Sequence, residues 1–338
     1  MNIEHRKSAF VRLGQWMRDV EKDSIEAVLQ QAHNENQWFT PENSLAAIRN
    51  LGQMLVEKQL NEWLANYEFK ENEPKRIGII MAGNIPLVGF HDLLCVLLSG
   101  NVAVVKMSKD DKVLLPFVLE RLFEIEPALK PQVELAEKLE NYDAAIATGS
   151  NNSAMHFEYY FRKVPHIIRR NRNAVAVISG NETPEELADL GHDIFDYFGL
   201  GCRNVSQIYL PQDFDIGRFY EPLQQYSEII NHNKYANNHT FQKAIHIMNL
   251  VPIFDNDFLI LVEHEQIASP TATCHYQRYN DIIEVEKVLT SKQDQVQCII
   301  AQPNTLKIIK TYPFGKGQQP KLWDYADGAD TMRWVANL

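Results

Sequence analysis

Four short β-prone runs separated by helical stretches are the feature of this sequence that most limits its fold. The runs occupy residues 76–83, 101–108, 143–150 and 173–180 and read RIGIIMAG, NVAVVKMS, DAAIATGS and NAVAVISG. They are apolar without strict alternation, which is typical of strands buried on both faces of a parallel sheet. The stretches between them read as crossover helices, at residues 86–99, 111–125 and 152–163. This alternation predicts a doubly wound α/β sheet.

The flanking regions have different patterns. Residues 1 to about 70 read as packing helices, one of which starts at Thr40 and Pro41. After Gln207 the pattern is mixed, with strands expected at 207–211, 258–264 and 296–302 and helices expected near 219–230 and 240–248. We therefore expect a larger domain at residues 1–199 and a smaller α/β domain at residues 200–338.

The composition excludes several classes of protein. A net charge of −11 argues against a nucleic-acid surface, which needs many Lys and Arg. The most apolar run, Ile85–Gly100, contains His91 and Asp92 and is too short to span a membrane. The first residues, MNIEHRKSAF, do not resemble a signal peptide, and the four cysteines form no CxxC pair. We expect a cytoplasmic protein with reduced thiols.

One cysteine lies where a nucleophile could be exposed. Thr183, Pro184 and Glu186 predict a capping box at the start of a helix, and Gly199 predicts its left-handed end. Cys202 would then sit on a tight turn before the next strand, where the neighbouring Arg203 and backbone N–H groups favour its thiolate. A lone cysteine is more often an inert buried residue, so this context carries the hypothesis.

A phosphate site is expected where the third run meets its helix. Thr148, Gly149 and Ser150 end a strand and begin a helix, whose free N–H groups and dipole attract anions. Ser150 could equally be a plain helix cap. The chain has no GxGxxG fingerprint, and the absence of Walker A, HExxH and GxSxG motifs argues against the commonest phosphoryl-transfer, zinc-protease and serine-hydrolase sites.

Five motifs in order carry a family resemblance: MAGNIPLVGF, GNVAVVKMS, ATGS, GLGCRN and PFGKGQQP. In order and spacing the chain resembles the aldehyde dehydrogenase superfamily. It is most similar to the LuxC-type acyl-CoA reductases, whose C-terminal ending resembles WDYADGADTM in this sequence. The resemblance implies an aldehyde-dehydrogenase-like fold, with a Rossmann-type parallel sheet domain that binds nucleotide and a smaller α/β catalytic domain.

The resemblance also implies residue roles. Cys202 would attack an acyl thioester, and hydride from a nicotinamide would release the aldehyde. Asn84 and the backbone N–H of Cys202 would stabilise the oxyanion. Lys106 would bind the adenosine ribose, and Ser150 a phosphate. The implied cofactor-binding residues are Met81, Ala82, Gly83, Lys106, Ser108, Lys109, Thr148, Gly149 and Ser150. Without the resemblance, Asn84 reads as a turn residue before Pro86 and Lys106 as a solvated lysine.

Two departures from the superfamily pattern refine the reaction. The E-L-G-G-K stretch of hydrolytic members is replaced by RNRNAVAVISG, so their water-activating Glu is missing, and Glu182 is out of register. This favours reduction of a thioester to an aldehyde. NAD-selective members often carry a Glu just beyond the position of Lys106, where this chain has Met107, Ser108 and Lys109, and a lysine there suits a 2′-phosphate. NADPH is therefore the expected cofactor, with NADH possible.

The expected activity is NADPH-dependent reduction of a fatty acyl thioester, on coenzyme A or a protein, to an aldehyde. Two rivals stay open: a cysteine acyltransferase or thioesterase with a vestigial nucleotide site, and a catalytically silent scaffold. An acyl-activating synthetase partner is implied by the resemblance only, and a homo-oligomer is expected.

Two further groups of residues are less informative. A basic run could hold the phosphates of coenzyme A or NADPH, although a solvated turn is the preferred interpretation; it comprises Arg162, Lys163, Arg169, Arg170 and Arg172. His232, His239 and His246 recur every seven residues, which does not suit a metal site on one helix, so no metal is predicted.

Overall fold

A computed structural model describes residues 1–69 and 73–338 and divides the chain into two compact units. The first contains Met1–Asn171 and Pro320–Leu338, and the second contains Arg172–Gln319. The boundary expected after residue 199 lies inside the second unit. The reason is strand pairing, because the strand that precedes this point, Asn173–Val177, pairs with the strand that follows it, Val205–Pro211.

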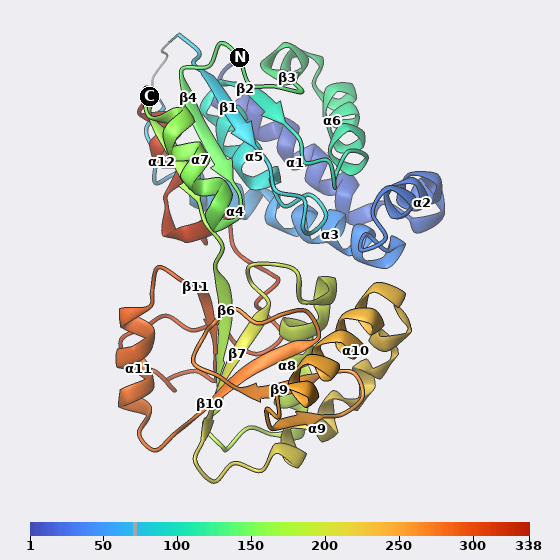
Figure 1. Ribbon diagram of the computed structural model, residues 1–338. Coiled ribbons are helices and arrows are strands. Elements are labelled where there is room, and N and C mark those ends of the chain that lie inside the picture. Colours follow the sequence, from blue (N-terminus) through green and yellow to red (C-terminus); the bar gives the residue numbers. More distant parts are fainter. Residues whose placement is uncertain (70–72) are drawn as a thin grey trace. The chain divides into compact units, whose positions relative to one another are not determined.

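The described residues of the first unit form a parallel sheet in the order β3-β2-β1-β4-β5 (Figure 1). Its strands are β1 (Arg76–Ile80), β2 (Val102–Lys106), β3 (Val133–Leu135), β4 (Ala144–Thr148) and β5 (His166–Arg169). Its helices are α1 (Ile3–Asp19), α2 (Glu26–Glu35), α3 (Pro41–Met54), α4 (Glu57–Leu64), α5 (Phe90–Ser99), α6 (Leu114–Ile125), α7 (Asn151–Phe161) and α12 (Thr331–Ala336). The predicted doubly wound α/β sheet is confirmed, whereas β3 and β5 were not anticipated.

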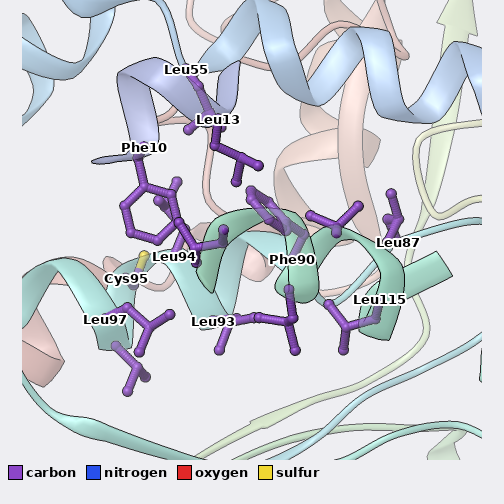
Figure 2. Close-up of a cluster of buried hydrophobic side chains, with 14 of the residues drawn as sticks. Phe10, Leu13, Leu55, Leu87, Phe90, Leu93, Leu94, Cys95, Leu97 and Leu115 are labelled. Atoms are coloured by element: carbon purple, nitrogen blue, oxygen red, sulfur yellow. The ribbon is translucent and has the colours of Figure 1, made fainter. Parts of the chain in front are cut away.

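The two faces of this sheet carry separate cores. Ile77 and Ile79 of β1 pack with α1, α5 and α6, and the alternate residues Ala145 and Ala147 of β4 pack against α7 on the other face. Figure 2 shows side chains of α1 and α5 gathered in the first of these cores. Helix α5 is apolar on nearly every side because it is buried, and it ends at Gly100, whose φ of 90° is a left-handed C-cap.

The described residues of the second unit form a sheet in the order β11-β6-β7-β10-β9-β8. Its strands are β6 (Asn173–Val177), β7 (Val205–Pro211), β8 (Ile253–Asp255), β9 (Ile260–Glu263), β10 (Thr273–Tyr279) and β11 (Val296–Ile300), of which β8 alone runs antiparallel to its neighbour. Its α-helices are α8 (Pro184–Phe195), α9 (Ile216–Leu223), α10 (Asn233–Met248) and α11 (Ile282–Ser291). Helices α8 and α9 pack on one face and α11 on the other.

The second unit differs locally from the sequence prediction. The helix expected at 219–230 is α9 followed by a 3₁₀ helix at Gln224–Asn231, and α10 starts earlier than residue 240. Strands β8 and β10 and helix α11 were not anticipated.

Candidate active site

Helix α8 begins with the predicted capping box. Thr183 Oγ1 accepts a hydrogen bond from the Glu186 backbone N–H at 3.2 Å, and the Glu186 carboxylate accepts one from the Thr183 N–H at 2.9 Å. Pro184 occupies the first helical position, where its missing N–H costs nothing. The prediction is confirmed, and the cap fixes where the helix that leads to Cys202 starts.

A strained turn joins α8 to β7. After the helix ends at Phe195, Tyr197, Phe198 and Gly199 adopt left-handed φ values of 53°, 59° and 74°. Only glycine adopts this conformation without steric cost, so the two aromatic residues store strain. Such strain persists only where surrounding contacts enforce it, and it clusters at functional sites.

Asn204 supplies contacts that hold this turn. Its side-chain amide donates to the carbonyls of Asp193 at 3.1 Å and Asp196 at 2.9 Å, at the end of α8. Its Oδ1 accepts from the Gly201 N–H at 2.8 Å. The residue is 1% exposed. One buried amide therefore ties the helix end to the turn that carries Cys202.

Cys202 differs from the other three cysteines in its exposure. Cys95, Cys274 and Cys298 are buried, whereas Cys202 is half-buried. Burial raises the pKa of Cys274 to about 12 and that of Cys95 well above its ordinary value, so these thiols stay protonated at neutral pH. Since only a thiolate is a good nucleophile, Cys202 is the one cysteine whose surroundings suit nucleophilic chemistry.

Glu182, the nearest carboxylate to the missing superfamily Glu, lies at the other edge of the sheet. It follows β6, whereas Cys202 precedes β7, and the two strands run parallel with Ala174 paired to Val205. Glu182 is 1% exposed, and its oxygens accept from the Ser179 and Gly180 N–H groups at 2.6 and 2.9 Å. Glu182 therefore organises its own loop and is not placed to activate water at Cys202.

The predicted cofactor residues gather at one edge of the first unit's sheet. Ile80 is paired with Lys106 of β2 and Ala147 of β4, so the segments that follow these three strands leave the sheet side by side. These segments hold Met81, Ala82, Gly83, Ser108, Lys109, Gly149 and Ser150, and Lys106 and Thr148 end β2 and β4. The strand order reverses between β1 and β4, and the carboxyl edge beside such a reversal is where open α/β sheets bind ligands.

The side chains at this edge differ in exposure. Asn84, Lys106, Lys109 and Ser150 are exposed, and Ser150 Oγ accepts from the Ser153 N–H at 3.2 Å as the N-cap of α7. The alternative role of Ser150 as a helix cap is thus present in the structure. The cap leaves the first N–H groups of α7 directed toward this edge, as an anion site requires.

Asp111 is a residue at this edge that the sequence did not reveal. It lines a small pocket with Met81, Ala82 and Ser108, and its Oδ2 accepts from the N–H of Leu87 at 2.8 Å. Leu87 has a left-handed φ of 58°, so the carboxylate supports a strained loop. Burial raises the pKa of Asp111 to about 6. In the sequence it reads as the first residue of a helix, and only the loop packing reveals its role.

The basic run does not form one patch. Arg169 is 3% exposed, pairs with Asp92 at 2.7 Å and donates to Thr331 Oγ1 at 2.6 Å. Both earlier interpretations, a phosphate site and a solvated turn, are wrong for Arg169, because its charge is already neutralised in a buried ion pair. Arg170 pairs with Glu158, and the Arg162 guanidinium stacks 4.3 Å from the Tyr159 ring.

His239 and His232, two of the three spaced histidines, have separate contacts. His239 Nε2 lies 2.9 Å from Asp255 Oδ1, and the His232 ring packs 4.3 Å from that of Phe198. His232 also accepts from the Tyr235 N–H as the N-cap of α10.

In the part of the chain that is described, none of the helices has the length and apolar composition that crossing a membrane requires.

Comparisons with known proteins agree with the sequence resemblance. The family model described as "Acyl-CoA reductase (LuxC)" matches residues 11–215. No curated protein matches the chain. Among solved structures, an indole-3-acetaldehyde dehydrogenase complexed with NAD+ matches with a TM-score of 0.65 and 11% identity, over 90% of this chain and 72% of that one.

Two further structures match over similar lengths. The aldehyde dehydrogenase KauB from Pseudomonas aeruginosa has a TM-score of 0.65 and 10% identity, over 90% of this chain and 73% of that chain. A mutant of aldehyde dehydrogenase C from Pseudomonas syringae, complexed with NAD+ and octanal, has a TM-score of 0.64 and 10% identity, over 89% and 73%. The fold is that of the aldehyde dehydrogenases, as predicted.

Proposed function

Because the chain belongs to the LuxC family of acyl-CoA reductases, we propose that it reduces a fatty acyl thioester to an aldehyde through an acyl-Cys202 intermediate. The observation that carries the proposal is the position of Cys202. It is the half-buried cysteine of the four, on a strained turn held by Asn204. Cys95 is enclosed in a core of the first unit, and Cys274 and Cys298 are enclosed in a core of the second. A nucleophile needs this combination of access and fixed geometry.

The chemistry assigned to Cys202 has two steps. Its thiolate attacks the thioester carbonyl and expels the carrier thiolate, which takes up a proton, so that an acyl-cysteine remains. Reduction of this acyl-cysteine to an aldehyde, with release of the cysteine thiolate, would use the hydride that a nicotinamide cofactor supplies when bound. The backbone N–H of Cys202 and the side-chain amide of Asn84 are the proposed donors to the oxyanion of each step, the latter on the family resemblance.

The position of Glu182 supports reduction over hydrolysis. A general base must lie within hydrogen-bond reach of the water that it activates. Glu182 lies beyond the carboxyl end of β6, and both its oxygens accept backbone N–H groups. Water at Cys202 would lack this base, so the acyl-cysteine would survive long enough to be reduced.

The carboxyl edge of the first unit's sheet fits a nicotinamide dinucleotide. Lys106 and Lys109 bring positive charge to this edge, and the N-terminus of α7 brings backbone N–H donors beside Thr148, Gly149 and Ser150. Two of the similar structures were solved with NAD+. We assign this edge to the cofactor, with NADPH preferred because Lys109 can pair with a 2′-phosphate and NADH as the alternative.

The remaining assignments follow from the family resemblance and the composition. An acyl-activating synthetase is the proposed partner, a homo-oligomer the proposed assembly and the cytoplasm the proposed location.

The test is an assay of the purified protein with a long-chain acyl-CoA and NADPH. We expect loss of nicotinamide absorbance together with a trapped aldehyde. Cys202→Ala should abolish both, whereas Cys274→Ala, a matched change at a buried thiol of the same unit, should retain them. Release of coenzyme A without NADPH oxidation would instead support the acyltransferase or thioesterase. Aldehyde formation by Cys202→Ala would contradict the acyl-cysteine.

A further inference from the structure

Arg203, next to the proposed nucleophile, is buried. It is 8% exposed, its Nε donates to the carbonyl of Gly317, and its guanidinium lies 4.8 Å from the centre of the Tyr312 ring. Its Nη2 is buried and has no hydrogen-bond partner among the described residues. A guanidinium normally uses its five donors when it is removed from water, so this arrangement leaves capacity for another group.

The surroundings of Arg203 lack the usual counter-charge. Burial is the largest influence and acts to lower the pKa of its guanidinium. Cys298, Tyr312, which also forms a side-chain hydrogen bond with it, and Cys202 act to raise this pKa, and the net shift is upward. No carboxylate of the described chain forms an ion pair with it. A buried cation without an anion is costly, and the groups beside Arg203 that can become anions are thiols and a phenol. Of the two thiols, Cys202 is the accessible one.

A buried carboxylate on α8 holds the backbone that Arg203 contacts. Asp193 is 0% exposed, and its two oxygens accept from the N–H groups of Gly315 and Gly317 at 2.6 and 2.7 Å. A Cβ at Gly317 would stand 2.7 Å from Asp193 Oδ1 and 3.3 Å from the Arg203 carbonyl. The loop is therefore held at two places. Its Gly315 and Gly317 N–H groups donate to the Asp193 carboxylate, and its Gly317 carbonyl accepts a hydrogen bond from Arg203.

We propose that the buried guanidinium of Arg203 holds Cys202 as a thiolate, and that Asp193 is a positioning residue that places Arg203 through the Gly315–Gly317 loop. The inference deepens the proposed function, since it takes Cys202 as the nucleophile. The guanidinium would lower the free energy of the thiolate relative to the thiol by a charge interaction that the buried surroundings screen weakly.

Other titratable groups surround the turn and belong to each element packed on it. They are His192 and Asp193 of α8, Asp196 directly after it, Cys298 of β11, Lys310 and Tyr312 before the loop, and His232, which stacks on Phe198. Of the carboxyl groups, Asp193 is the one that accepts from the loop N–H groups, and burial raises its pKa to about 7. As the pH falls through 7, Asp193 gains a proton and one loop N–H loses its acceptor. Loss of Cys202 reactivity on acidification should then be steeper than a single titration.

The test is the pH dependence of Cys202 alkylation by iodoacetamide in the full-length protein, read from the mass of the peptide that carries Cys202. The parent should react with a midpoint below the value of about 8.5 for a free cysteine. Arg203→Gln can still donate to the Gly317 carbonyl but has no charge. We expect it to raise the midpoint by at least about one unit, which is roughly tenfold less thiolate at pH 7. Arg203→Lys should stay close to the parent.

Arg278→Met is the matched control for losing one cation. Arg278 also donates to backbone carbonyls, those of Pro211, Gln212 and Phe214, but at the opposite edge of the same sheet. Its loss should leave the midpoint unchanged. Asp193→Asn, which cannot accept from both loop N–H groups, should raise the midpoint by less than Arg203→Gln and remove the steep acid limb.

An unchanged midpoint in folded Arg203→Gln would overturn the proposal, as would an equal shift in Arg278→Met. If Arg203→Gln does not fold, as judged by circular dichroism, the Asp193→Asn variant provides the test. An alkylation midpoint equal to that of the parent would then overturn the proposal. The assay uses neither acyl-CoA nor nucleotide. Failure to form aldehyde would therefore contradict the proposed function without changing the pH midpoint of Cys202 alkylation. A midpoint near the value for a free cysteine in a protein that does form aldehyde would contradict this inference alone.

Discussion

At the scale of single residues, the clearest electrostatic features are two buried carboxylates that contact backbone N–H groups. Asp111 supports the Leu87 loop in the first unit, and Asp193 supports the Gly315–Gly317 loop in the second. In both, burial outweighs the hydrogen bonds and raises the pKa, to about 6 and about 7. Each residue therefore stabilises a local geometry while making the stability of the protein depend on pH.

The pH dependence can be tested at Asp111. Its pKa is higher in the folded protein than the ordinary 3.8, so its contribution to stability is complete below about pH 4 and is lost as the pH rises through 6. Two pKa units correspond to about 3 kcal/mol. The free energy of unfolding of the parent, relative to Asp111→Asn, should fall by roughly this amount between pH 4 and 7 in urea titrations. A difference that stays constant with pH would contradict the shifted pKa.

Lys109 offers a test of cofactor preference. It is exposed at the edge beyond β2, where the proposed 2′-phosphate would bind. Lys109→Glu should raise the KM for NADPH about tenfold to a hundredfold, the range of one charge-assisted hydrogen bond, and should change the KM for NADH much less. Lys130→Glu makes the same charge change at an exposed site beyond α6 and serves as the control. Equal effects on both cofactors would remove Lys109 from the phosphate site.

At the scale of elements, the segment from α8 to β7 combines a start that the local sequence determines with a turn that packing determines. Its start is a capping box, its end is followed by three left-handed residues, and Asn204 closes the turn. Glycine at 199 fits one of these positions, but Tyr197 and Phe198 adopt theirs only because the packed turn enforces it. The cap is predictable from spacing, and the strain is not.

The contribution of the cap can be measured. Thr183→Ala removes the acceptor of the Glu186 N–H and should lower the free energy of unfolding by about 1 kcal/mol. Thr183→Ser keeps a hydroxyl at the N-cap and should stay within a few tenths of a kcal/mol of the parent. Chemical denaturation of the three proteins gives the comparison. Equal losses in both variants would show that the methyl group of Thr183, and not its cap, matters.

At the scale of the whole molecule, the C-terminal segment returns to the first unit. Residues 320–338 belong with residues 1–171, and Trp63 of α4 donates its indole N–H to the Tyr325 hydroxyl at 2.7 Å. Tyr67 continues this network to Asp330, and Asn101 donates to the Val335 carbonyl at 3.0 Å. The ends of the chain thus share one core, so that the second unit is an insertion into the first.

Tyr325→Phe tests this closure. It leaves the fully buried Trp63 N–H without its acceptor, and we expect the free energy of unfolding to fall by about 1–3 kcal/mol. Tyr159→Phe removes a hydroxyl from an exposed ring of the same unit and should change stability by less than about 0.5 kcal/mol. If the two variants unfold at the same denaturant concentration, the network does not stabilise the first unit.

The sequence by itself determined the fold class, the positions of strands β1, β2, β4 and β6 and the capped helix before Cys202, because these depend on apolar periodicity and on caps set by neighbouring residues. It did not determine that β6 belongs to a different sheet from the other three strands. It also identified the family, which the match over residues 11–215 shows. The unit boundaries, the buried Arg169–Asp92 pair and the Asp193 clamp on the Gly315–Gly317 loop were decided by tertiary structure. Their partners lie 77 to 124 positions apart in the chain, and no local pattern records which distant groups meet when the chain folds.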